Sequence, residues 1–269
     1  MNRFPAWKYA LIALSIVVAF VYTLPNFFGE SPAVQVSSAK ATTKVDTALL
    51  AQIDRSKLSE TDQLAYDVFK YTEERALAGA TDEMRALTEV RPLNHFFGLH
   101  TFYPSFASGK GVAPFKTLAN YEDNLKRHDD YIVFVDRAIA KFREGMATGV
   151  LETKLTVGIM VTQLDTQLAL PIAESQFMGP VQEFPAEFSD ADKTRLTAAY
   201  EAKTRALYEA NTRLRDFLRD EYLPAARASI GLAQMKGGDK LYALLVEDST
   251  TLPMTPEQIP QLGLSEVAR

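Results

Sequence analysis

An uncharged apolar segment near the amino terminus constrains this chain more than any other part of it. Residues 9–29 number 21 and include no charged side chain, and a helix needs about 20 mostly apolar residues to cross a bilayer. Arg3 and Lys8 precede the segment, and Glu30 is the first charge after it. Because basic residues stay on the cytoplasmic side, this asymmetry predicts a single transmembrane helix with the C-terminal domain on the outer side.

Residues 1–28 are accordingly predicted to form a signal-anchor in a lipid bilayer, and residues 29–52 a tether. Two other interpretations stay open. The segment could be a buried core helix, or a signal peptide cleaved near residues 37–39, which supply the small side chains that a signal peptidase needs. The anchor side chains expected in the membrane are Tyr9, Leu11, Ile12, Leu14, Ile16, Val17, Val18, Phe20 and Val21.

The first fifty or so residues resemble the amino terminus of the SecD family, accessory subunits of the bacterial Sec translocase. The resemblance extends through polar positions, in NRFP at 2–5, WKY at 7–9, LPN at 24–26 and GESPAVQ at 29–35. It implies a bacterial inner-membrane anchor and a periplasmic domain. A role as a translocase accessory is less favoured, since SecD has further membrane helices and this sequence contains no second comparable segment.

Composition excludes several classes of function. Cysteine is absent, which excludes disulfides, thiolate metal sites, a cysteine nucleophile and an acylated cysteine. The net charge of −5 provides no basic field for nucleic acid. No two of the 3 histidines are four apart with a glutamate between them, so the helical zinc motif is absent. The sequence therefore predicts no catalytic residue and no metal ligand.

From about residue 53 onwards, apolar residues recur every three or four positions, which predicts an all-α, bundle-like domain. The clearest helix begins at a Thr117 cap, contains His128 as a satisfied histidine of the core or its rim, and ends at Gly149. Its apolar face consists of Leu118, Tyr121, Leu125, His128, Ile132, Val135, Ile139, Phe142 and Met146.

Other helices are indicated by caps and by prolines. Ser59 opens one that continues toward Leu77 and, past Gly79, to Leu87. Ser189 opens a long one that Pro224 ends, and a capping box with proline opens a last one at residues 255–258. The apolar positions expected to be buried are Leu155, Ile159, Leu164 and Leu168 in a further helix, and Leu196, Tyr200, Leu207, Leu214, Leu218 and Tyr222 in the long one. In the last helix Ile259, Leu262 and Leu264 are expected to be buried against partners, which could lie beyond residue 269.

The helical part, residues 53–269, is similar to a second bacterial family, domain of unknown function 885. The similarity rests on DRSKLS at 54–59, DQLAYD at 62–67, PFKT at 114–117, REGM at 143–146 and FLRDEYLPAAR at 217–227. It implies a largely helical fold related to zinc metallopeptidases, with zinc bound only by a C-terminal half that would follow this sequence. The chain is therefore expected to be a truncated N-terminal half, completed by that half or by a partner subunit.

The candidate site lies in residues 91–115, where several glycines and prolines break regular structure. A segment this rich in aromatic residues is expected to fold onto the domain and to line a substrate pocket. The histidines are five residues apart across Gly98, which is poor spacing for metal ligands on one helical face. The substrate-pocket candidates are His95, His100, Phe96, Phe97, Phe102 and Tyr103.

Three functional hypotheses follow. The first is a membrane-anchored, periplasm-facing domain that is at most an incomplete metallopeptidase-like hydrolase and is inactive alone. The second is a non-catalytic helical interaction module, and the third a SecD-like translocase accessory. Separately, the junction near Ile53 could be a genuine fusion or an accident of assembly.

Overall fold

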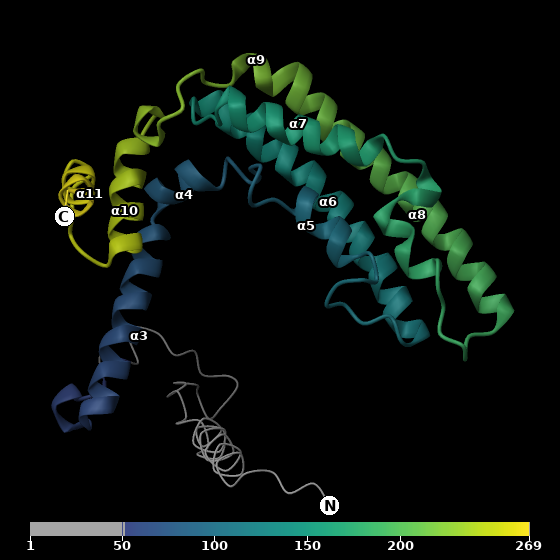
Figure 1. Cartoon of the computed structure of the whole chain (residues 1–269), viewed down its shortest axis with the longest axis horizontal. Helices are drawn as coiled ribbons and strands as arrows, with labels where there is room; N and C mark the ends of the chain where they lie inside the picture. Colours follow the sequence, from purple (N-terminus) through teal and green to yellow (C-terminus); the bar gives the residue numbers. More distant parts are fainter. Residues whose placement is uncertain (1–49, 51, 269) are drawn as a thin grey trace, which may run out of the picture. The chain divides into compact units, whose positions relative to one another are not determined.

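The computed structural model describes residue 50 and residues 52–268, and their regular elements are all helices (Figure 1). The predicted anchor and nearly all of the predicted tether lie outside the described residues. Among the residues that are described, none belongs to a helix both long and apolar enough to cross a membrane. The chain divides into two compact units, Met1–Ala76 and Leu77–Arg269. The all-α prediction for the helical part is confirmed.

The first unit contains the 3-10 turn η2 (Arg55–Lys57) and most of α3 (Glu60–Gly79). Ser59 caps α3 as predicted, because its hydroxyl accepts the Asp62 N–H at 3.2 Å. Arg55 holds η2 to α3 through two hydrogen bonds to the carboxylate of Asp67, at 2.7 and 2.6 Å. The helix does not continue to Leu87.

The core of the second unit is formed by α6 (Leu118–Thr148), α7 (Lys154–Leu168) and α8 (Asp190–Asp216), which lie side by side (Figure 1). The sequence predicted all three from local signals. Thr117 and Asn120 form a capping box at the start of α6, and Gly149 ends it with a φ of 81°, a left-handed conformation that suits glycine. Side chains buried in this core include Val135, Phe142, Met160, Leu164, Leu207 and Leu214.

The face that α7 buries differs from the predicted one. Val157, Met160 and Leu164 are buried, three and four residues apart, whereas Leu155 is exposed and Ile159 only partly buried. The short sequence of α7 is apolar on several sides, so periodicity alone did not fix its orientation.

The long helix opened by Ser189 also ends differently. It stops at Ala225, one residue past the predicted Pro224, but before that α8 passes into a π-helical segment, η5 (Phe217–Tyr222), and then a last turn, α9 (Leu223–Ala225). A π-turn contains an extra residue and rotates the following side chains. Phe217, Leu218 and Tyr222 are all buried.

A smaller core joins α4 (Asp82–Thr88) to η6 (Leu232–Gln234) and α10 (Gly238–Thr250). Thr81 caps α4 and separates it from α3, which explains why the helix predicted through Leu87 is interrupted. Gly237 precedes α10 with a φ of 71°, a turn conformation that few other residues adopt readily. The buried side chains here are Met84, Leu87, Val90, Val150, Met235 and Leu241.

The last helix, α11 (Gln258–Val267), forms only half of the predicted capping box. The Gln258 side chain accepts the Thr255 N–H at 2.8 Å, but no side chain caps the first turn. Ile259 is partly buried, while Leu262 and Leu264 are exposed. No described element covers that face, so burial of Leu262 and Leu264 against partners beyond residue 269 stays a prediction.

Candidate binding surface

The candidate segment contains a helix where irregular chain was expected. The helix α5 (Leu99–Phe106) includes Pro104 and starts at Gly98. Its inner face buries His100 and Tyr103, whereas Leu99, Phe102 and Phe106, three and four residues apart, point outward and are exposed. Positions with this spacing share one side of a helix, so α5 presents an aromatic stripe to solvent.

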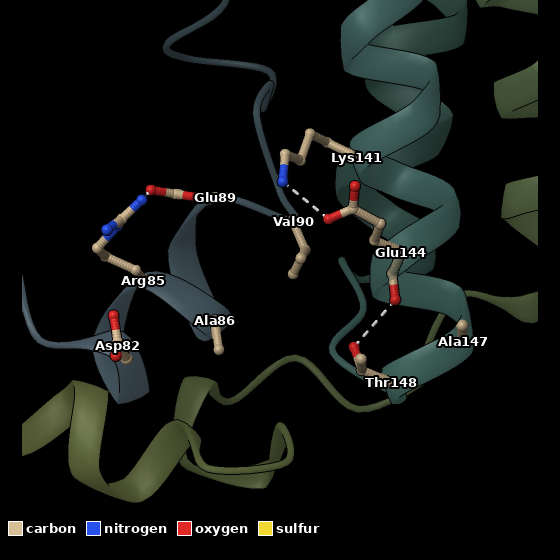
Figure 2. A pocket seen from close by; sticks show the side chains of 9 residues that line it. All are labelled: Asp82, Arg85, Ala86, Glu89, Val90, Lys141, Glu144, Ala147 and Thr148. Carbon is tan, nitrogen blue, oxygen red and sulfur yellow. Dashed lines mark hydrogen bonds and ion pairs between the residues drawn. The ribbon is translucent and has the colours of Figure 1, made fainter.

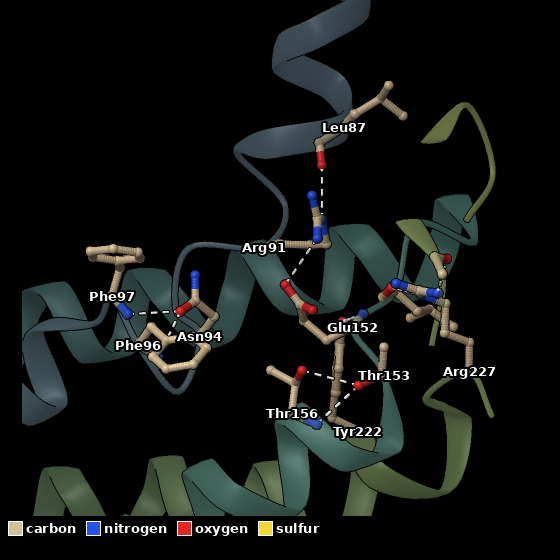
Figure 3. Close-up of polar contacts among 12 residues, drawn as sticks. Leu87, Arg91, Asn94, Phe96, Phe97, Glu152, Thr153, Thr156, Tyr222 and Arg227 are labelled. Atoms are coloured by element: carbon tan, nitrogen blue, oxygen red, sulfur yellow. Dashed lines mark hydrogen bonds and ion pairs between the residues drawn. The ribbon is translucent and has the colours of Figure 1, made fainter. Parts of the chain in front are cut away.

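The backbone just before α5 is held in a tight turn. Oδ1 of Asn94 accepts the N–H groups of Phe96 and Phe97, at 2.8 and 2.7 Å (Figure 3). Side-chain acceptors of this kind stabilise turns. As a result the Phe96 and Phe97 side chains lie on the surface, with 69% and 74% of their area exposed.

Two glutamines one turn apart on α7 fix the same segment from beneath. Gln163 donates to the His95 carbonyl at 3.0 Å, and its oxygen accepts from His100 Nε2 at 3.0 Å. Gln167 donates to the His100 carbonyl at 2.7 Å. Gly98 packs against the other edge of the His100 ring, where a Cβ would lie 2.4 Å from Nδ1. The histidine therefore supports the turn and is not displayed.

Tyr103 connects α5 to a buried polar network on α6 and α8. Its hydroxyl lies 2.7 Å from Nδ1 of His128, and its ring stacks on Tyr131 with centroids 4.5 Å apart. The Asn124 amide donates to Tyr200 at 3.1 Å and lies 3.2 Å from Nε2 of His128. With Nε2 accepting, Nδ1 carries the proton toward Tyr103. Of the two places that the sequence left open for a satisfied His128, core or rim, it is the core.

Burial decides the ionisation of this network. Desolvation, assisted by the charge of Lys203, lowers the pKa of His128 to about 4, and desolvation also lowers the pKa of His100. Burial raises the pKa of Tyr103 well above its ordinary value. At neutral pH these groups are uncharged, so the network is suited to holding α5 in place.

The six sequence candidates therefore separate into three groups by burial. His100 and Tyr103 are buried supports, and His95 is half-buried beside Phe96. Phe96, Phe97 and Phe102 are exposed, so the expectation that these three rings pack onto the domain is wrong. The outward groups of this segment form what we call the aromatic surface: Phe96, Phe97, Leu99, Phe102, Phe106 and Val112.

The cavities of the second unit lie elsewhere. A cleft of about 470 Å³ separates α4 from α6 (Figure 2). Four of its five charged side chains pair with one another, Lys141 with Glu144 at 2.8 Å and Arg85 with Glu89 at 2.7 Å; the fifth is Asp82. A polar hollow of about 260 Å³ lies between the end of α5 and η4 (Gln176–Val181) and is lined in part by Ser108 and Ser175. None of the six sequence candidates lines either cavity.

A second polar cluster, near the ends of α6 and α8, was not singled out from the sequence. Arg91 donates to the Glu152 carboxylate at 3.1 Å in a largely buried ion pair (Figure 3). The Tyr222 hydroxyl accepts the Glu152 N–H at 2.9 Å, and Arg227 donates to the carbonyls of Leu151, Ser229 and Gly231. Tyr222 and Arg227 belong to the segment at 217–227 that carried the family resemblance. These contacts join chain segments and serve the fold.

The zinc that the family resemblance implies finds no ligand set in the described part of the chain. No group of three or more histidine, aspartate or glutamate side chains there is placed to hold a metal ion. His100 Nε2 is engaged by Gln163. The described residues therefore do not fit a zinc site.

Comparison with known families decides the relationship of the chain. Residues 29–269 match the profile of a family described as "Bacterial protein of unknown function (DUF885)". The chain belongs to the DUF885 family. The DUF885 match begins at residue 29, ahead of the boundary near Ile53 suggested by the resemblance, and so includes the segment predicted as a tether.

A solved structure shares the fold of this DUF885 chain. A protein from Colwellia psychrerythraea, described as a lipoprotein, superposes with a TM-score of 0.60 at 20% identity, over 65% of this chain and 30% of that one. At this identity the likeness shows the fold alone.

The SecD likeness is short. SecD of Escherichia coli is 42% identical over 50 residues, which are 19% of this chain and 8% of SecD. SecD of Pseudomonas aeruginosa is 39% identical over 62 residues, 23% of this chain and 10% of that protein. The chain thus spans a tenth or less of the length of these SecD relatives.

Proposed function

We propose that this DUF885 chain is a membrane-tethered, periplasm-facing binding domain that acts through its aromatic surface. Within the predicted anchor, the apolar segment at residues 9–29 has an uncharged length and a basic flank that favour an outward-facing single pass. The short SecD likeness supports an anchor of this kind. The lipoprotein description of the Colwellia neighbour is in keeping with a location at a membrane.

The observation that carries the proposal is the contrast between the two faces of α5. Asn94 Oδ1 accepts from the backbone of the segment, and Gln163 and Gln167 donate to it, yet the outer face exposes large apolar side chains. Rigidly held, exposed apolar groups that gather in one place are typical of binding sites. The buried titratable groups nearby support α5 and face no cavity described above, which favours binding over catalysis.

The hydrolase interpretation is the second candidate, and it rests on the family resemblance to metallopeptidases. In that case the described residues would provide a binding face and the metal ligands would come from other sequence. The Colwellia protein, of which this chain covers 30%, is in keeping with a larger complete protein.

Cysteine labelling tests the proposed binding function, because the natural chain has no cysteine. Phe97 and Ile230 are equally exposed, at 74% and 76%, so Phe97→Cys and Ile230→Cys form a matched pair. We expect a membrane-impermeant maleimide to label Ile230→Cys in spheroplasts and to label Phe97→Cys much more slowly. In detergent both variants should react alike.

Equal labelling of the two variants in spheroplasts would show that the aromatic surface is unoccupied and would contradict the binding function. Labelling of Ile230→Cys only after the membrane is broken would contradict the outward orientation.

A further inference from the structure

The sequence around the aromatic surface lacks carboxylates. Between Glu89 and Glu122 there is no aspartate or glutamate, although the chain as a whole has a net charge of −5. The same interval contains two lysines, Lys110 and Lys116, and a third basic residue, Arg91, whose charge is paired with Glu152. An apolar surface in a weakly basic segment without carboxylates is complementary to a lipid bilayer, which has an apolar interior and anionic headgroups.

The geometry extends this surface beyond α5. Gly111 lies against the backbone of Phe106, where a Cβ would be 3.6 Å from the Phe106 Cα, so the turn brings Val112 to the end of the aromatic stripe. Val112 is 90% exposed. The guanidinium of Arg127 lies 5.9 Å from the centre of the Phe106 ring. The surface therefore combines aromatic and aliphatic groups with adjacent cations.

Of the acidic residues of α6 nearest to Arg127 in sequence, two are paired, whereas Asp130 is exposed and makes no ion pair in the described part of the chain. Asp123 accepts from Lys126 at 3.2 Å, and Asp129 forms an ion pair with Lys203. Lys110 and Lys116 are exposed and make no ion pair within the described part of the chain. These two lysines remain available to an anionic partner.

We infer that the aromatic surface docks into an anionic phospholipid bilayer, the same membrane that holds the anchor. Phenylalanine and aliphatic side chains enter the boundary between headgroups and acyl chains, while lysines contact anionic headgroups. The predicted tether, residues 29–52, spans at most about 85 Å, so the anchored domain stays within reach of the bilayer. The inference rests on the proposed function, because it names the occupant of that same surface.

Tryptophan fluorescence tests the inference on the full chain reconstituted into vesicles. Trp7 is the single tryptophan, so a Trp7→Phe background allows one reporter at a time. Phe97→Trp reports the aromatic surface and Ile230→Trp the matched control position. The vesicles contain phosphatidylglycerol and phosphatidylcholine, with or without brominated acyl chains that quench nearby indoles.

We expect brominated lipid to reduce Phe97→Trp emission at least about twofold, with a blue shift, since the indole would lie at the acyl boundary. Ile230→Trp emission should not change. Replacing Lys110 and Lys116 by glutamine, or omitting phosphatidylglycerol, should lessen the quenching. Circular dichroism checks that each variant keeps its helices.

The parent protein separates the two possible failures, because Trp7 lies beside the proposed anchor. If Trp7 is quenched and Phe97→Trp is not, the anchor is inserted and the docking inference is wrong. In that event, slow maleimide labelling of Phe97→Cys in spheroplasts would indicate that a protein partner covers the aromatic surface. If Phe97→Trp is quenched and Trp7 is not, docking is supported and the anchor is contradicted. If neither is quenched, both are contradicted.

Discussion

His128 shows how a single side chain is adapted to the interior of this domain. It is fully buried, with its two ring nitrogens facing Tyr103 and Asn124. Protonation would place an Nε2–H against the Asn124 amide, which already donates there. The apolar spacing of α6 predicted that this histidine is in the core or at its rim. Its partners could not be predicted, because Tyr200 reaches Asn124 across 76 positions of sequence and only the packing of α6 on α8 brings them together.

The ionisation of His128 predicts acid sensitivity. Its pKa is about 4 in the folded state and about 6.5 when unfolded, so unfolding takes up a proton between these values. The stabilisation is complete above pH 6.5 and is lost as pH falls toward 4. Between pH 6.5 and 5 the loss is about 2 kcal/mol.

Chemical unfolding of the parent and of His128→Gln at a series of pH values measures this effect. The free energy of unfolding of the parent should exceed that of His128→Gln by less as pH falls from 7 to 5, because only the parent loses the contribution of His128. Titration of the carboxylates occurs in both proteins and cancels in this difference. A pH-independent difference would show that His128 does not titrate on unfolding in this range.

Helices were predicted well where their signals are local. Thr117, Ser189 and Gly149 specify the ends of α6 and α8 by hydrogen bonding and backbone conformation within a few residues. The π-segment after α8 and the buried side of α7 depend on what packs against them. Periodicity therefore predicted the helices and missed the rotation introduced at Phe217.

The Arg91–Glu152 ion pair joins the segment between α4 and α5 to the segment between α6 and α7. The two side chains are 14% and 9% exposed. Removing one partner leaves a charge with little access to water, so Glu152→Ala should reduce the free energy of unfolding by about 3 kcal/mol. Glu144→Ala removes the exposed pair with Lys141 and should cost less than about 1 kcal/mol.

Urea unfolding of the two alanine variants measures this difference. Similar losses of unfolding free energy for Glu152→Ala and Glu144→Ala would mean that the buried Arg91–Glu152 pair stabilises the fold no more than an exposed pair does.

For the molecule as a whole, sequence composition revealed the aromatic residues of the candidate segment but not where they point. Phe102 and Tyr103 are adjacent, and one is exposed while the other is buried. That separation follows from α5, which was not predicted because its glycine- and proline-rich surroundings resemble irregular chain. The exposed stripe is what turns a predicted pocket lining into a proposed binding surface.

Carbonate extraction of bacterial membranes decides whether this domain is tethered as proposed. The account predicts that the full-length chain, 29.9 kDa, stays in the washed membrane pellet. Val17→Asp places a carboxylate within the apolar segment at a cost of about 3 kcal/mol and should shift the protein toward the supernatant. A soluble product from the natural sequence, whether full-length or shortened by cleavage near residue 39, would contradict the account.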